Sequence, residues 1–180
     1  RQAMLPSDFE RKCELSPVCS RIVLKALYLA RLARPDLLWA VNSLAREVTK
    51  WNVACDRRLE RLMGYIKLTK NQTLKAHLGD NFEDCRLVLF TDASWADFKQ
   101  DSKSTSGGLV AIMGPNTYVP LSWACKKQDA VSHSSTESEV IALDLNLRNE
   151  ALPCLNLWAD VLATTRPKDG IFRSSNVRMD

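Results

Sequence analysis

The sequence lacks any run of about 18 uncharged apolar residues, the length that a membrane-spanning helix needs. Residues 1–14, RQAMLPSDFERKCE, lack the apolar centre of a secretory signal peptide and do not begin with methionine. Internal repeats and low-complexity segments are also missing. These absences argue against a membrane protein and a secreted precursor. They predict an intracellular chain, cytoplasmic or nuclear, that is a piece of a longer protein.

The sequence also contains no CxxC pair and no cysteine beside a histidine at the spacing of metal ligands. His77 and His133, the two histidines, are far apart and have no cysteine neighbours. Zinc sites usually combine such ligands at short, regular spacing, so the sequence argues against one. Reduced, mostly buried thiols are expected instead. The cysteines are scattered along the chain: Cys13, Cys19, Cys55, Cys85, Cys125 and Cys154.

The net formal charge of +4 conceals an asymmetry between two parts of the chain. Residues 1–80 carry 15 lysines and arginines against 8 aspartates and glutamates, a net charge of +7. Residues 81–180 carry 10 against 13, a net charge of −3. This asymmetry suits a protein that binds a polyanion with one part and performs metal chemistry with the other. Two ordinary solvated surfaces would give the same pattern.

Residues 1–80 are predicted to be helical. The segments 35–50 and 52–70 both place apolar residues at helical spacing, so each has one apolar face. The following segment, 71–85, is polar and rich in turn-forming residues. It places a domain boundary near residue 80.

The second of these helical segments carries basic side chains away from its apolar stripe. Asn52, its first residue, is a candidate N-cap. A solvated helix surface and a contact with nucleic-acid phosphates both fit the basic pattern, which Asp56 and Glu60 interrupt. The basic residues are Arg57, Arg58, Arg61, Lys67 and Lys70.

The apolar pattern changes after residue 85 from helical spacing to strands. Three apolar runs, 86–92, 105–113 and 118–126, predict three strands. The turn sequence GPNT at 114–117 predicts a hairpin between the second and third. The glycine pair 107–108 indicates a bulge or a close approach of another backbone.

The part after the third strand is predicted to be mainly helical. A helix is expected from about 135 to 152, where Pro153 ends or kinks it, with a shorter helix over 154–162. The last residues, 176–180, could begin another strand. The order of strands and helices predicts a layered α/β or α+β domain.

Acidic residues occur where the predicted strands and helix begin or end. Asp92 ends the first strand, Glu137 and Glu139 open the helix on different faces, and Asp180 ends the chain. Clustered carboxylates can hold Mg²⁺ ions that support phosphodiester cleavage. Plainer roles also fit, since Asp92 could be a turn residue and Asp180 a chain end.

The two glutamates are open to a second interpretation as capping residues. A capping box pairs a serine or threonine N-cap with a glutamate three residues later. Ser134 with Glu137 fits this spacing, and so does Thr136 with Glu139.

Several motifs occur together in one order along the chain. The C-terminal part contains FTDASWADFKQDSKSTSGG, LSWACKKQ and SSTESEVIAL, and the N-terminal part contains ARPDLLWAVNSLAR and WNVACDRRLERLMGYIKLTKNQTL. In order and spacing these motifs resemble the reverse transcriptase and ribonuclease H region of Copia-type retrotransposon Pol polyproteins. The resemblance extends over about residues 30–152.

The resemblance implies an α/β fold, a ribonuclease H-like mixed sheet with flanking helices. Its first three strands would form an antiparallel meander. This domain would occupy residues 81–180, incomplete at its C-terminus, after a helical thumb or connection segment at residues 1–80. The implied activity is that of an endonuclease, a hydrolase that cuts the RNA strand of RNA–DNA hybrids with Mg²⁺ or Mn²⁺. The implied partners are the hybrid and the remainder of a Pol polyprotein, without a membrane.

The resemblance also assigns roles residue by residue. Asp92, Glu139 and Asp180 match the catalytic, metal-binding acids. Glu139 is favoured over Glu137 because Ala142, three residues on, fits the small-residue spacing of ribonuclease H helices, and Thr136 would then cap the helix. The residues expected to hold the hybrid backbone are Arg57, Arg58, Arg61, Lys67, Lys126 and Lys127.

The sequence departs from the family pattern at several points. Ser94 stands where the family has a second aspartate, and Val140 stands where it has tyrosine. The polymerase motif Y-x-D-D is missing, and so is the segment that bears the family's fourth acid. Two functions remain expected: hydrolysis of RNA in the parent protein, or a catalytically dead or domesticated remnant that binds nucleic acid without cleaving it. A purely structural interaction domain is a third.

Overall fold

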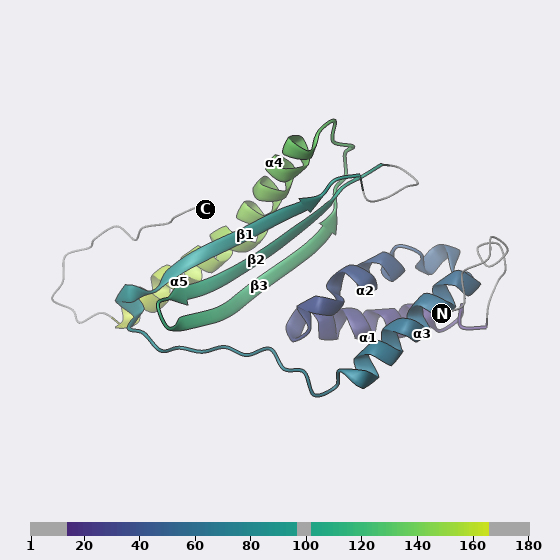
Figure 1. The fold of residues 1–180 in the computed structure, drawn as a ribbon, viewed down its shortest axis with the longest axis horizontal. Helices are drawn as coiled ribbons and strands as arrows, with labels where there is room; N and C mark the ends of the chain where they lie inside the picture. Colours follow the sequence, from purple (N-terminus) through teal and green to yellow (C-terminus); the bar gives the residue numbers. More distant parts are fainter. Residues whose placement is uncertain (1–13, 97–101, 166–180) are drawn as a thin grey trace. The chain divides into compact units, whose positions relative to one another are not determined.

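The computed structural model of the chain describes residues 14–96 and 102–165 (Figure 1). The chain forms two compact units that separate between Leu74 and Lys75. The first unit is helical, and the second combines a sheet with helices. None of the helices in the described ranges is both long enough and apolar enough to cross a membrane.

The first unit contains three α-helices: α1 (Cys19–Leu32), α2 (Leu38–Ala45) and α3 (Val53–Leu68). Two 3₁₀ turns, η2 (Pro35–Leu37) and η3 (Val48–Lys50), flank α2. The helix predicted over 35–50 is therefore an α-helix only in its middle. Helix ends often tighten into 3₁₀ turns, because their terminal groups lack partners four residues away. The core of this unit is apolar and fully buried: Val23, Ala30, Leu37, Val41, Leu44 and Leu59.

The start of α3 shows how its sequence fixes its position. The Asn52 side chain accepts a hydrogen bond from the Cys55 backbone N–H at 3.0 Å, which confirms the predicted N-cap. The Trp51 indole N–H donates to Asp56 at 2.7 Å in the same turn. Both bonds satisfy polar groups near a helix end that would otherwise lack partners.

Replacing Asn52 by alanine is expected to lower the free energy of unfolding by about 1 kcal/mol, because the Cys55 N–H loses its acceptor. Urea denaturation of the two proteins, followed by the circular dichroism signal of the helices, would measure the difference. Asn52→Asp, which keeps an accepting oxygen, is the control and should unfold near the wild-type midpoint. Equal losses in both variants would contradict the capping role.

The second unit contains an antiparallel sheet of three strands in the order β1-β2-β3. The strands are β1 (Arg86–Ser94), β2 (Thr105–Gly114) and β3 (Thr117–Lys127), so all three predicted strands and the hairpin are confirmed. In the described residues this sheet is entirely antiparallel, whereas a mixed sheet was expected. The additional strand predicted at 176–180 lies outside the described residues.

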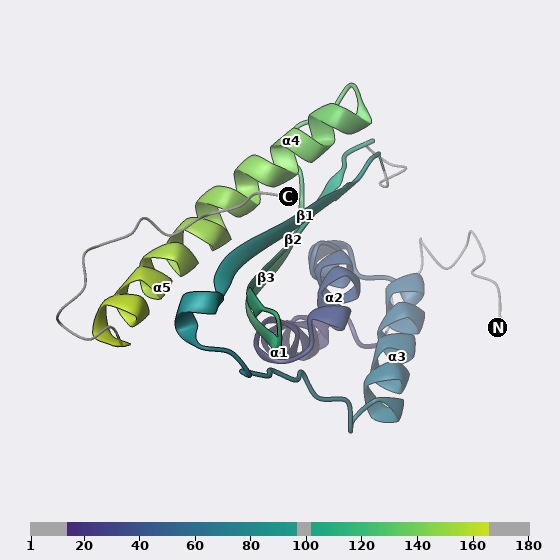
Figure 2. The ribbon, with the colours of Figure 1, turned by 60° about the vertical axis from the view of Figure 1, so that its left-hand side comes forward.

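Helices cover one face of this sheet (Figure 2). The helix α4 (Ser135–Asn146) packs on β1 and β2, and a π-helical turn, η5 (Leu147–Ala151), joins it to α5 (Leu152–Thr165). Pro153 does not end the helical segment. It lies in the first turn of α5, where its missing N–H is tolerated, and the wider π turn comes directly before it. The core between the layers contains Leu87, Val110, Ile112, Ala151 and Trp158.

The glycine pair in β2 lies against α4. A Cβ atom at Gly108 would come within 2.2 Å of Asn146 Oδ1, so only glycine fits there. The sequence predicted a bulge or a close backbone approach here, whereas the group that approaches Gly108 is a side chain of α4. The register shift between β2 and β3 lies elsewhere, between Val110 and Ala111.

The segment before β1 is fixed to the β2–β3 turn. His77 and Tyr118 exchange backbone hydrogen bonds of 2.9 and 2.8 Å. Asp80 accepts from the Asn116 backbone N–H at 2.7 Å and from its side-chain amide at 3.1 Å. Burial raises the pKa of Asp80, but hydrogen bonds from Thr117 and Asn116 outweigh it and leave this pKa below its usual value. We call residues 75–85 the strap; the sequence indicated only a polar connection there.

Candidate functional site

Asp92 lies near the end of β1 with an exposed side chain. Its cross-strand partner is Gly107 of β2, where an added Cβ would meet only the Asp92 carbonyl oxygen, at 3.7 Å. Successive side chains of a strand point to opposite faces, so Asp92 faces away from Thr91, whose hydroxyl contacts Asn146 of α4. The Asp92 carboxylate is therefore on the face of the sheet that α4 does not cover. It makes no hydrogen bond or ion pair with any residue in the described ranges.

The two glutamates of α4 have different environments. Ser134 is the N-cap: its hydroxyl accepts from the Glu137 N–H at 3.1 Å, while the Glu137 carboxylate accepts from the His133 N–H at 2.6 Å. The expectation that Thr136 caps the helix is wrong, because Thr136 lies inside the first turn of α4. Glu137 is thus engaged at the start of the helix in a variant of the capping box, in which its carboxylate accepts from the residue before the N-cap.

Glu139 is exposed and has no partner among the described residues. It directly follows Ser138 and precedes Ala142 by three residues, and both of these side chains are fully buried against the sheet. Residues three apart lie on the same side of a helix, so Glu139 borders the sheet-facing stripe of α4. Of the two glutamates, Glu139 is therefore the one with an available carboxylate near the sheet.

The third predicted acid, Asp180, lies outside the described residues. Within residues 14–96 and 102–165, no three histidine, cysteine, aspartate or glutamate side chains come together as a metal-binding group. The available donors, Asp92 and Glu139, are carboxylates, the ligand type that Mg²⁺ prefers. Mg²⁺ is often held by one or two carboxylates, with substrate phosphates and water as its other ligands. In chemical type these two residues fit such an ion.

A buried polar seam between α4 and the sheet was missed by the sequence analysis. The Gln128 amide donates to Ser106 Oγ at 3.0 Å and to the Ser138 carbonyl at 2.8 Å, and it accepts from Ser132 Oγ at 2.9 Å. All four residues are at most 4% exposed. The seam thus ties the end of β3 to both β2 and the first turns of α4.

Asn146 forms a second part of this seam. Its Nδ2 donates to the carbonyls of Gly107 and Ala142, both at 2.8 Å, and to Thr91 Oγ1 at 3.3 Å. Asn146 is completely buried, and its Oδ1 has no hydrogen-bond partner in the described part of the chain. The sequence contained one signal for this role. Asn146 follows positions 138 and 142 at the same spacing of four residues, which places all three on one side of the helix.

The predicted basic residues differ in their availability. Arg61 and Lys67 of α3 are exposed, whereas Arg57 and Lys127 are half-buried. The Arg58 guanidinium donates to Ser43 Oγ and so connects α3 to α2 within the first unit. Lys126 is exposed and lies 3.9 Å from Asp129 in a pair that is open to solvent, so the pair contributes little to stability.

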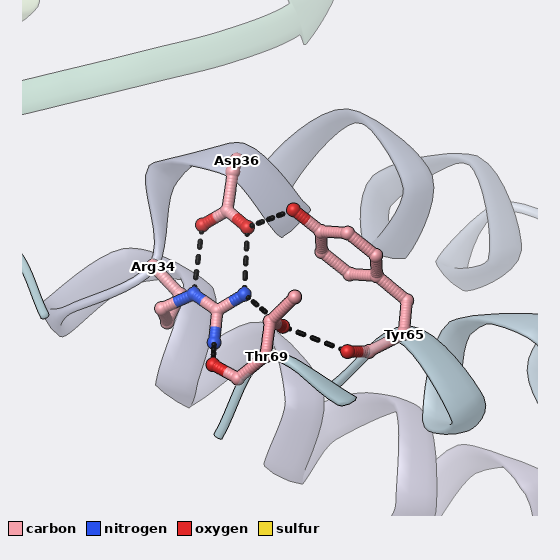
Figure 3. A network of polar contacts seen from close by, with 4 residues as sticks. All are labelled: Arg34, Asp36, Tyr65 and Thr69. Atoms are coloured by element: carbon pink, nitrogen blue, oxygen red, sulfur yellow. Dashed lines mark hydrogen bonds and ion pairs between the residues drawn. The ribbon is translucent and has the colours of Figure 1, made fainter. Parts of the chain in front are cut away.

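The RPD part of the ARPDLLWAVNSLAR motif forms a polar cluster in the first unit (Figure 3). Arg34 is only 7% exposed, and its guanidinium makes two bonds to the Asp36 carboxylate, at 2.9 and 2.7 Å. It also donates to the Thr69 carbonyl at 3.0 Å and to the Thr69 hydroxyl at 2.8 Å. The Tyr65 hydroxyl donates to Asp36 at 3.0 Å, and the Arg34 guanidinium lies 5.7 Å from the Tyr65 ring centre. We call these four residues the Arg34 cluster; it connects the segment between α1 and α2 to the end of α3.

Charge pairing in the Arg34 cluster shifts both ionisable partners. The hydrogen bonds from Arg34 are the main reason that the pKa of Asp36 lies below its ordinary value. The same bonds raise the pKa of Arg34 above its ordinary value. Both residues are therefore charged at neutral pH.

Comparison with known proteins gives several relatives of this chain. The uncharacterized mitochondrial protein AtMg00810 of Arabidopsis thaliana is 32% identical over 140 residues, which are 78% of this chain and 51% of that protein. The Retrovirus-related Pol polyprotein from transposon RE1 of the same plant is 32% identical over 123 residues, 68% of this chain and 8% of that protein. Secreted RxLR effector protein 161 of Plasmopara viticola is 33% identical over 117 residues, 65% of this chain and 78% of that protein.

No family model matches the sequence, and no solved structure matches it. The chain spans about half the length of the mitochondrial relative and less than a tenth of the RE1 polyprotein. A second Pol polyprotein, from transposon RE2 of Arabidopsis thaliana, is 31% identical over 128 residues. The chain is therefore homologous to a short segment of retrotransposon Pol polyproteins.

Proposed function

We propose that residues 75–180 are a ribonuclease H-like domain of a Copia-type element, which hydrolyses the RNA strand of RNA–DNA hybrids in its parent protein. The helical residues before it would belong to the thumb or connection region of the reverse transcriptase. One observation carries the proposal. Asp92 on β1 and Glu139 on α4 are both exposed and unpaired within the described residues, and α4 packs directly on β1.

In this proposal Asp92 and Glu139 hold Mg²⁺ or Mn²⁺, with Asp180 as a third ligand. When bound, the ion supplies activation of water and stabilisation of the leaving oxygen in phosphodiester hydrolysis. Asp92 lies near the end of β1, which is at one edge of the described sheet, and α4 packs on β1. The two acids belong to elements that are in direct contact, and the proposal requires one ion to reach both carboxylates.

The basic residues would hold the hybrid through its phosphates, without reading its sequence. Arg61, Lys67 and Lys126 are the best candidates, because their side chains are exposed. Arg57 and Lys127 are half-buried and therefore less available, and Arg58 already binds Ser43. Binding by such contacts should weaken steeply as the salt concentration rises, since counterions compete for the phosphates.

Cleavage of a labelled RNA–DNA hybrid in Mg²⁺ and in Mn²⁺ tests the proposed function. We expect cutting by the wild-type chain and a loss of more than about a hundredfold in the Asp92→Asn and Glu139→Gln variants, because each removes a charged ligand. Glu137→Gln is the matched control, since glutamine also completes a capping box and cutting should persist.

Two results would contradict this function. One is a loss in Glu137→Gln as large as that in Glu139→Gln. The other is a wild-type chain that binds the hybrid with steep salt dependence but cuts it with neither metal. That second result would support a remnant that binds nucleic acid without cleaving it.

A further inference from the structure

We propose that two buried carboxamides, Asn146 and Gln128, are positioning residues that fix α4 on the sheet and so set the placement of Glu139 relative to Asp92. The inference rests on the proposed function, because it treats these two acids as ligands of one metal site. Neither amide touches the reacting atoms. Each acts through the backbone next to one of the acids.

Asn146 holds the backbone around Asp92. Its amide donates to the carbonyl of Gly107, the cross-strand partner of Asp92, and to the hydroxyl of Thr91, the residue before Asp92. Asn146 is the last residue of α4. Its amide also donates to the Ala142 carbonyl, one turn earlier in the same helix. The position of β1 and β2 at Asp92 is therefore tied directly to this helix.

Gln128 holds the backbone around Glu139. Its amide donates to the carbonyl of Ser138, the residue before Glu139, and to the hydroxyl of Ser106, the residue before Gly107. The Ser132 hydroxyl in turn fixes the orientation of the amide by donating to its oxygen. α4 is thus attached to the sheet at two separate points, with Glu139 beside one of them and Asp92 beside the other.

The seam carries features that reduce stability, which is the reason to assign it a role beyond packing. The buried Oδ1 of Asn146 has no partner in the described residues, and an unpaired buried polar atom is destabilising. The same side chain requires glycine at position 108, and glycine weakens a strand interior. An apolar contact would stabilise the layers without these penalties. What the amides add is directional placement of α4, and local features that oppose stability are typical of functional sites.

Paramagnetic broadening by Mn²⁺ in NMR spectra of the full chain tests the inference without relying on cleavage. In the wild-type protein, amide signals beside Asp92 and beside Glu139 should broaden over the same range of Mn²⁺ concentration. We expect Asn146→Ala and Gln128→Ala to require about 10- to 100-fold more Mn²⁺, the range seen when residues that orient metal ligands are removed. Ile112→Ala is the control: a core change that lowers the melting temperature but leaves the Mn²⁺ affinity within about twofold.

The possible results distinguish the positioning role of the two amides from the proposed metal site. Unchanged Mn²⁺ affinity in the folded Asn146 and Gln128 variants would overturn the positioning role and leave the proposed site standing. A wild-type chain without broadening beside Asp92 and Glu139 would overturn the proposed function, and this inference with it. If circular dichroism shows that Asn146→Ala does not fold, Asn146→Ser, which is small and keeps a donor, takes its place in the same comparison with Gln128→Ala.

Discussion

The Asp36→Asn variant is expected to unfold its helical unit with a free energy about 3 kcal/mol below that of the wild type. The substitution removes the negative charge that pairs with Arg34, and Arg34 is almost completely buried. A buried cation without its partner is strongly destabilising, because the protein replaces little of its hydration. Thr69 still accepts two hydrogen bonds from the guanidinium, and Asp36 is 36% exposed, so the loss stays at the lower end of the range for buried pairs.

The same ion pair predicts a pH dependence. Hydrogen bonding from Arg34 lowers the pKa of Asp36 in the folded protein, so the unfolded state binds the proton more readily. The stabilisation is therefore complete above the unfolded pKa of about 4 and is lost as the pH falls through the lower folded value. The raised pKa of Arg34 has no effect in this acidic range.

Urea denaturation followed by NMR signals of α1, α2 and α3, at pH 7 and at several values below pH 4, would measure both effects. Asp36→Asn should flatten the acidic loss of stability as well as lower the value at pH 7. Glu60→Gln, which removes an exposed charge from α3, is the control and should change stability by less than about 0.5 kcal/mol. If the free energy of unfolding of Asp36→Asn fell at acidic pH as steeply as that of the wild type, the pH dependence would not come from this ion pair.

Gly108→Ala is expected to destabilise the sheet unit by about 3 kcal/mol, because the added methyl group cannot fit without moving α4. Its Cβ would lie 2.2 Å from Oδ1 and 2.3 Å from Cγ of Asn146, and that side chain is fully buried. Gly107→Ala is a matched control one residue away. Its Cβ would meet a single atom at 3.7 Å, an ordinary contact, and no glycine of the described chain has a positive φ.

Thermal and urea denaturation of the two single variants and of Gly108→Ala combined with Asn146→Ala would test this contact. Removing the Asn146 amide makes room for the methyl group, so the double variant should be more stable than the sum of the single effects by about 2 kcal/mol. If the stability losses of the two single variants simply added in the double variant, the added methyl group would be accommodated elsewhere. Asn146 would then not be the reason that position 108 requires glycine.

The local parts of the fold could be read from the sequence. The apolar runs of the three strands, the turn at 114–117 and the Asn52 cap all depend on residues close together in the chain, and all agree with the structure. The errors also have local causes. Two overlapping serine and threonine capping patterns precede α4, and spacing could not show that Ser134 rather than Thr136 is the N-cap.

The long-range parts could not be read in this way. Asn146 meets Gly107 across 39 residues of sequence, and Arg34 meets Thr69 across 35. The spacing of apolar residues indicates which side of a helix is buried, but it does not indicate which polar atom of the sheet that side contacts. The predicted acids show the same limit. The sequence named Asp92 and Glu139, while their exposure and the capping role of Glu137 needed the structure.

The strap has a practical consequence for dissecting the chain into fragments. A boundary near residue 80, which the sequence suggests, cuts through this element and removes His77 and Gly79. The backbone N–H and carbonyl of Tyr118 and the hydroxyl of Thr117 would then lose their present partners. The edge of β3 at Tyr118 would be left open to pairing with another molecule, a common route to aggregation. An expression fragment that begins at Lys75 keeps the pairing at Tyr118 and the hydrogen bonds to Thr117.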